Sequence, residues 1–317
     1  MRNDRPLLGI LFMVGFCIIA PVMDAMAKLT PHDVPVSEIL AARFGFQVIT
    51  LLPLALVLGM AHRPDFREMA GHLVRSAMLL LATFFFFSAI RYMPIANAIA
   101  IFFVEPFILT LLGGFFLGED IGPRRIIACV VGFIGALFVI QPSFEDLGLI
   151  ALFPLGTAVT FAAYMILTRS KSANQHPITL QAYTALAASI LIFPLIFVFD
   201  GSGVALLDPV WPTPFAWATL FAVGLLATIS HLFLSTALKL APAATIAPLQ
   251  YLEIAGSVTV GYLLFKDFPD RLTWLGIAII VSSGLFVFAR ERINSIKRGP
   301  TPLFEDCLNR KCRLAFK

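Results

Sequence analysis

The chain has 317 residues, of which 59% are hydrophobic and only 13% are charged. Soluble globular proteins carry charges on about 25% of their residues, so this composition excludes a soluble protein and predicts an integral membrane protein of many helices. The net charge of +4 does not point to nucleic-acid binding, because no compact basic face or nucleic-acid-binding motif accompanies it.

Apolar runs of about 17–25 residues recur, each long enough to cross a hydrocarbon core of about 30 Å. The first run is too long for the apolar region of a signal peptide, and Asp24 interrupts the approach to a cleavage-like site, so an uncleaved first helix is expected. Ten membrane helices are predicted in two groups of five, at 7–28, 36–60, 76–90, 95–117 and 126–140, and then at 148–168, 178–199, 215–237, 243–265 and 272–289.

The segments between these helices are polar or rich in glycine and proline. A polar stretch covers 62–75, a hinge between the two groups covers 141–147, and a basic tail covers 290–317. Cys307 and Cys312 in the tail have no nearby histidine or further cysteine, whereas zinc sites normally need four ligands. No metal and no cofactor is therefore expected.

The two groups of helices are related by a shift of 148 residues, which carries Glu105 onto Glu253. Further matches under this shift are Ala89 and Ala237, Pro94 and Pro242, Ala96 and Ala244, Gly113 and Gly261, and Glu119 and Asp267. We therefore predict an all-α membrane fold of two five-helix repeats, at 7–140 and 148–289. An odd number of helices in each repeat inverts the second copy, as in many secondary transporters.

The distribution of lysine and arginine predicts the orientation. Most of these residues fall on one side if the amino terminus is inside, and this holds even when the tail is left out. Both termini are therefore expected to be cytoplasmic.

Two glutamates lie deep inside predicted helices. By the helical rise, Glu105 and Glu253 each lie about 15 Å into the membrane, approached from opposite sides. Buried carboxylates of this kind often bind a proton or a cation for coupling. The alternative is a protonated or hydrogen-bonded glutamate that only fixes helix packing.

Three charged residues lie near the predicted outer side. Asp24 and Lys28 are spaced to share one helix face, and Arg43 lies about 10 Å deep in the next helix. They are interpreted as an outer vestibule, or else Asp24 and Lys28 form only an interfacial ion pair. A buried arginine needs a partner, for which Asp24, Glu38 and Glu105 are the candidates.

Polar and aromatic residues elsewhere in the helices are candidates for lining a small-molecule cavity. They are Tyr164, His231, Gln250 and Tyr251. The alternative for each of them is a role in helix packing, which is the more common role of a lone polar residue in a membrane bundle. No glycine-rich phosphate loop, H-E-x-x-H or G-x-S-x-G motif is present, so an enzyme is not expected.

Short motifs in both halves resemble the EamA-type repeats of the drug/metabolite transporter superfamily. The motifs lie at 91–98, 103–106 and 117–119, and again at 240–242, 251–253 and 266–267, and the early position of Arg43 also fits. The resemblance covers about 7–289. It departs from the family at Lys266 and Asp267, where Gly-Glu is usual, so the turn or gate role expected for Glu119 is not shared by both halves.

The resemblance implies a secondary transporter in a bacterial inner membrane that moves a small metabolite, such as an amino acid, S-adenosylmethionine or riboflavin. Alternating access is expected, either proton-coupled or facilitative, and export is slightly favoured by analogy. Substrate is expected at Arg43, Tyr164, His231, Gln250 and Tyr251. A monomer and a homodimer both stay open. The alternatives are a lipid-modifying membrane enzyme, and a non-transporting sensor whose tail binds anionic lipid or another protein.

Overall fold

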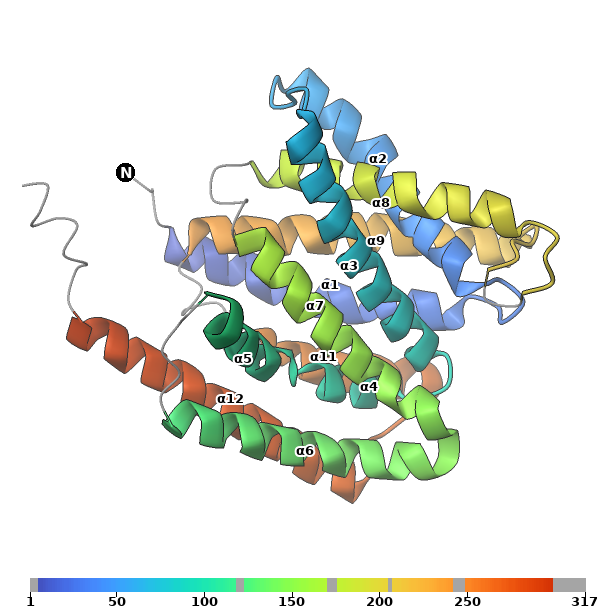
Figure 1. The fold of residues 1–317 in the computed structure, drawn as a ribbon. Coiled ribbons are helices and arrows are strands. Elements are labelled where there is room, and N and C mark those ends of the chain that lie inside the picture. Colours follow the sequence, from blue (N-terminus) through green and yellow to red (C-terminus); the bar gives the residue numbers. More distant parts are fainter. Residues whose placement is uncertain (1–4, 118–122, 170–175, 205–206, 242–248, 299–317) are drawn as a thin grey trace, which may run out of the picture.

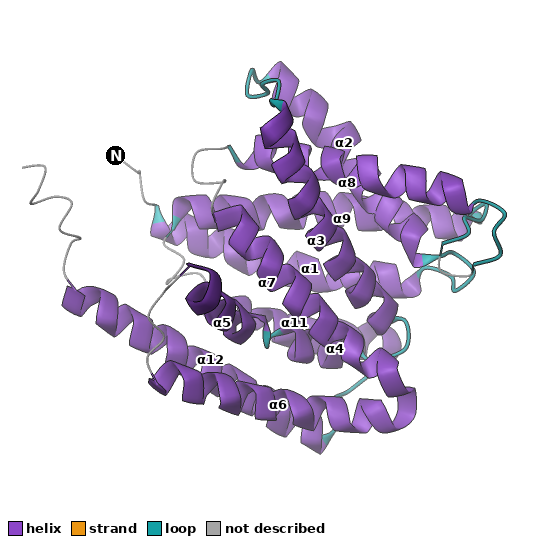
Figure 2. Ribbon diagram, in the orientation of Figure 1, coloured by secondary structure: helices purple, strands orange, loops and turns teal. Residues whose placement is uncertain are grey.

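A computed structural model describes residues 5–117, 123–169, 176–204, 207–241 and 249–298. The regular secondary structure of the described residues is helical, without a β-strand, and loops or turns join the helices (Figures 1 and 2). The helices are α1 (Pro6–Leu29), α2 (Val36–Val57), α3 (Phe66–Ile90), α4 (Ile95–Phe102), α5 (Glu105–Leu117), α6 (Pro123–Leu147), the 3₁₀ helix η1 (Gly148–Leu152), α7 (Phe153–Arg169), α8 (Pro177–Phe199), α9 (Pro214–Leu240), α11 (Leu252–Phe265) and α12 (Arg271–Arg298).

The predicted all-α membrane fold is confirmed. Seven helical segments of the described chain are long and apolar enough to cross a membrane. The remaining apolar helices are shorter, at Ile126–Ile140, Leu252–Phe265 and Arg271–Val287. Together they account for the ten predicted membrane segments.

Several predicted boundaries were wrong because helices continue through polar sequence. Helix α3 begins at Phe66, inside the predicted polar stretch, because the Asp65 carboxylate accepts a hydrogen bond from the Glu68 backbone and caps the helix. Helix α6 continues through the predicted hinge to Leu147, and the chain turns at Gly148, whose φ of 59° suits glycine. Helix α12 runs on to Arg298, into the predicted tail.

Helices from the two halves pack against each other in matched pairs. Helix α1 packs on α9 as α7 packs on α3, and α1 packs on α11 as α7 packs on α5. The pairs α2–α8 and α6–α12 each join equivalent helices of the two halves, and α4 of the first half packs on α11 of the second. Figure 1 shows α6 and α12 side by side along one edge, and α1 beside α9. Two copies related by a pseudo-two-fold axis produce this pattern.

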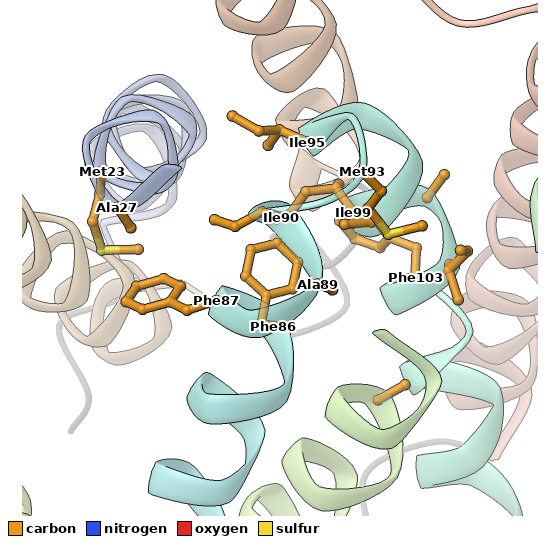
Figure 3. Packing of buried hydrophobic residues seen from close by; sticks show 14 of the residues in the cluster. Met23, Ala27, Phe86, Phe87, Ala89, Ile90, Met93, Ile95, Ile99 and Phe103 are labelled. Carbon is orange, nitrogen blue, oxygen red and sulfur yellow. The ribbon is translucent and has the colours of Figure 1, made fainter. Parts of the chain in front are cut away.

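The main hydrophobic core draws residues from helices of both halves, and Figure 3 shows the part where α1, α3 and α4 meet. Phe87 of α3 points toward Met23 and Ala27 of α1, while Ile99 belongs to α4. These side chains are almost fully buried, so α3 is held between α1 and α4. This packing holds the end of α3 in place, and α3 also carries the buried polar residues Arg75 and Thr83.

Candidate functional site

The helices that carry the two deep glutamates are both interrupted. Helix α4 ends at Phe102 and α5 begins at Glu105, so the predicted continuous helix at 95–117 was wrong. In the second half, a helical turn ends at Gln250, Tyr251 breaks it, and α11 begins at Leu252. The shift of 148 residues carries Phe103 onto Tyr251, so the two breaks occupy equivalent positions.

Proline explains the first break. Pro106 is the second residue of α5, where its missing N–H is not needed but where it prevents α4 from continuing. No proline follows the second break, which has no comparable local signal in the sequence.

The two breaks meet in the bundle. The rings of Phe103 and Tyr251 lie 5.0 Å apart between centroids and are inclined by 34°. Tyr251 is buried, and its hydroxyl has no hydrogen-bond partner among the described residues. This hydroxyl lies against Gly284 of α12, where a Cβ would collide with it. Residues that are 148 positions apart are therefore direct neighbours at the centre of the fold.

Glu105 and Glu253 lie in the first turns of the two half-helices that follow these breaks. Glu105 is 9% exposed and Glu253 is 7% exposed, and Oε1 of Glu105 has no hydrogen-bond partner in the part of the chain that is described. The positive end of a half-helix dipole faces each carboxylate. Interrupted helices that meet where two inverted repeats join form the substrate and ion sites of many transporters.

Helix α1 brings a third carboxylate and a thiol to this centre. Asp24 is 3% exposed and interacts electrostatically with both Glu253 and Arg43. About two turns earlier on α1, the Cys17 thiol donates to the Leu249 carbonyl oxygen over 3.4 Å. Asp24 of α1 therefore acts electrostatically on Glu253 of α11 and on Arg43 of α2.

Arg43 is buried without a carboxylate partner. Its Nη1 donates to Oγ1 of Thr83 over 2.8 Å, and its Nη2 donates to Nε2 of His231 over 2.6 Å. An arginine can only donate, so His231 accepts at Nε2 and carries its proton on Nδ1. None of the three predicted carboxylates makes an ion pair with Arg43, and Glu38 instead accepts from the Val210 backbone.

The predicted Asp24–Lys28 ion pair was also wrong. The Lys28 ammonium lies 2.9 Å from Oδ2 of Asp267, in the loop after α11. It also donates to the Met93 carbonyl oxygen over 3.0 Å and lies 4.7 Å from the Phe265 ring centroid. The shared-face spacing suggested a partner within one helix, whereas packing offered a carboxylate from the other half of the chain.

A second buried arginine was not predicted. Arg75 was placed in a polar segment outside the membrane, yet it is 3% exposed inside the bundle. Its Nη2 donates to Oγ1 of Thr184, to the Leu180 carbonyl oxygen and to Nδ1 of His72. One signal in the sequence could have indicated this burial. Arg75 directly precedes the apolar run at 76–90, so the helix could have been predicted to begin before Arg75.

Tyr164 interacts with both buried arginines, Arg43 and Arg75. It is 8% exposed, and the guanidinium carbon of Arg75 lies 5.9 Å from its ring centroid. It interacts electrostatically with Arg43 and with Arg75. Gln250 is half-buried at the second break, adjoining Tyr251.

Three of the residues discussed from the sequence fall in parts of the chain that the structure does not describe. Glu119, Cys307 and Cys312 lie outside the described residues. Among the residues that are described, no three histidine, cysteine, aspartate or glutamate side chains are grouped to hold a metal ion.

Comparison with known proteins finds relatives over nearly the whole chain. The model of the EamA-like transporter family matches residues 7–141 and again 148–289. A riboflavin transporter of Rhizobium johnstonii is 30% identical over 92% of this chain and 94% of its own. An S-adenosylmethionine uptake transporter of Rickettsia conorii is 28% identical over 85% and 88%. A pseudopaline exporter of Pseudomonas aeruginosa is 28% identical over 86% and 93%.

A solved crystal structure shares the fold. It is similar over 90% of this chain and 96% of its own, with a TM-score of 0.59 and 20% sequence identity.

Proposed function

Because the chain belongs to the EamA-like transporter family, we propose that it carries a small organic metabolite across a bacterial inner membrane by alternating access. The named relatives carry riboflavin or S-adenosylmethionine, or export pseudopaline. One of these names specifies uptake and another export, so the experiment below measures both entry and exit of each compound. No nucleotide-binding motif is present, which favours secondary transport over an ATP-driven pump.

The hydrogen bond between Arg43 and His231 is the observation that carries the proposed site. Arg43 belongs to α2 in the first half and His231 to α9 in the second, and their side chains meet at 2.6 Å inside the bundle. A polar contact between the halves, at membrane depth, is where alternating-access transporters bind substrate. The proposed substrate contacts are Arg43, Tyr164, His231, Gln250 and Tyr251.

Glu105 and Glu253 are proposed to couple transport to protons. Both carboxylates are buried at the starts of half-helices whose preceding breaks touch through Phe103 and Tyr251. A change of charge at either glutamate therefore acts where the two halves meet. Facilitative transport is the alternative that the pH dependence of flux tests.

Alternating access requires contacts between the halves that break at one side at a time. Lys28 and Asp267 form such a contact, joining the end of α1 to the loop after α11. The positive-inside rule places this pair on the outer side and both termini in the cytoplasm. Residues 7–140 and 148–289 are the proposed moving units, and the positively charged 290–317 is the proposed cytoplasmic extension. The active form is proposed to be a monomer or a homodimer.

Purified protein in liposomes with an imposed pH gradient tests the function. Entry and exit of labelled amino acids, S-adenosylmethionine, riboflavin and purines are measured for the unaltered protein, Arg43→Ala and Glu105→Gln. Saturable flux of one class that is lost in Arg43→Ala supports the proposal. Absence of flux of every compound, with the protein correctly inserted, contradicts it and favours a non-transporting membrane partner.

A further inference from the structure

We propose that the substrate carries a carboxylate and that Arg75 binds this group. The inference rests on the proposed transport function and adds a substrate class and a second binding residue to it. Arg75 lies on α3 and faces α7 and α8, away from the predicted Arg43 site but connected to it by Tyr164.

Arg75 is a buried cation without an ionic partner. It is 3% exposed, and the ion pairs in the described part of the chain are Lys28–Asp267, His62–Glu68 and His72–Glu68. Glu68 is held by His62 over 2.9 Å and lies on the far side of His72. Burying an uncompensated charge is costly, and an anionic group on a bound substrate would compensate it.

The guanidinium is anchored on one side and free on the other. All three of its hydrogen bonds to described residues use Nη2, which reaches Thr184, Leu180 and His72. Nε is buried without a partner, and no hydrogen bond to a described residue involves Nη1. The anchored side holds the group in place before a ligand arrives, which lowers the entropy cost of binding.

Arg43 is a weaker candidate for the anion. Both of its terminal nitrogens already donate, to Thr83 and to His231. Its guanidinium carbon also lies 5.1 Å from the Phe44 ring centroid and 5.7 Å from that of Phe87. These contacts occupy Arg43, so it serves to orient the body of the substrate.

The spacing of the two arginines suits a small metabolite. Thr83, the α3 partner of Arg43, lies eight residues after Arg75, which is about 12 Å along the helix axis. Tyr164 interacts electrostatically with both guanidinium groups. Arg75 supplies one positive charge at this place, which a carboxylate neutralises, whereas a doubly charged phosphate there would leave a buried negative charge.

Matched compounds with and without a carboxylate provide the test. Binding to the purified full-length protein is measured by equilibrium dialysis with labelled S-adenosylmethionine against its decarboxylated form, with L-phenylalanine against phenethylamine, and with riboflavin as a probe without a carboxylate. Flux of the same compounds is measured separately in liposomes, so a failure of transport is recognised on its own.

The variants are Arg75→Gln and Arg75→Lys, with Arg67→Gln as the matched control. Arg67 is exposed on the same helix, about two turns before Arg75. Thermal unfolding of each variant shows whether it folds. If Arg75→Gln does not fold, Arg75→Lys, which retains the charge, takes its place in the test.

We expect the carboxylate member of at least one pair to bind more tightly, and Arg75→Gln to weaken it roughly 10- to 100-fold. Arg75→Lys should recover part of this loss, and Arg67→Gln should bind as the unaltered protein does. Equal binding within every pair, preferred binding of riboflavin, equal weakening of both members in Arg75→Gln, or binding of no compound would overturn the inference. Flux without carboxylate preference would overturn it and leave the transporter function standing.

Discussion

Replacing Asp267 with asparagine should open the end of the protein that the Lys28–Asp267 pair holds closed. The pair joins α1 of the first half to the loop after α11 in the second half, with 2.9 Å between Nζ of Lys28 and Oδ2 of Asp267. Asparagine keeps the size of the side chain and removes its charge. Lys28 keeps its hydrogen bond to the Met93 carbonyl oxygen, so the change isolates the contribution of the ion pair.

The burial of the pair sets the expected size of the effect. The side chains are 14% and 30% exposed, which is intermediate between surface and fully buried ion pairs. Exposed pairs contribute about 0.2–1 kcal/mol, and breaking a fully buried pair costs about 3–5 kcal/mol. We therefore expect about 1–2 kcal/mol for this pair, which shifts the ratio of closed to open states about 5- to 30-fold.

Distances between spin labels measure this shift. Labels at His32 and Phe268, both exposed near the pair but in different halves, are introduced after the four native cysteines are replaced. Pulsed electron paramagnetic resonance in lipid nanodiscs should show more of the longer distance in Asp267→Asn. The control is Asp33→Asn, which removes an exposed carboxylate near the same end and should leave the distances unchanged.

A double-mutant cycle decides whether the pair itself is responsible. Lys28→Met and Asp267→Asn should each shift the distances, and the double variant should shift them no further than Lys28→Met alone. Additive shifts, or an unchanged distribution in both single variants, would refute the idea that this ion pair holds the two halves together.

Three further predictions follow from the site. Glu105→Gln and Glu253→Gln should flatten the pH dependence of flux in liposomes, and an unchanged pH profile in both would exclude proton coupling at these residues. Gly256→Ala should destabilise the protein by about 1–3 kcal/mol, seen as a lower Tm, because its Cβ would lie 2.7 Å from the Cys17 carbonyl oxygen; an unchanged Tm would contradict this close approach. Arg43→Lys should lower flux about 10- to 100-fold although it keeps the charge, because an ammonium cannot reproduce the two-pronged contact; full flux would show that only charge is needed.

The sequence alone was sufficient to predict the class of fold and most of its helices. A membrane helix needs about 20 apolar residues, and this local requirement is visible in any window of the chain. The rarity of charge inside such windows singled out Arg43, Glu105 and Glu253, and all three are buried in the structure. Pro106 is a visible signal for a helix break, but the sequence analysis predicted one uninterrupted helix at 95–117.

The contacts between helices were decided only by the tertiary structure. Lys28 and Asp267 are 239 positions apart, and Arg43 and His231 are 188 apart, so no local spacing connects them. Arg75 was assigned to a polar loop because burial of a cation depends on acceptors from α8, such as Thr184, that hydropathy cannot reveal. The sequence by itself determined which groups enter the membrane, because that depends on each segment's own transfer from water. Only the packed helices decided which groups meet, because each partner is supplied by a different part of the chain.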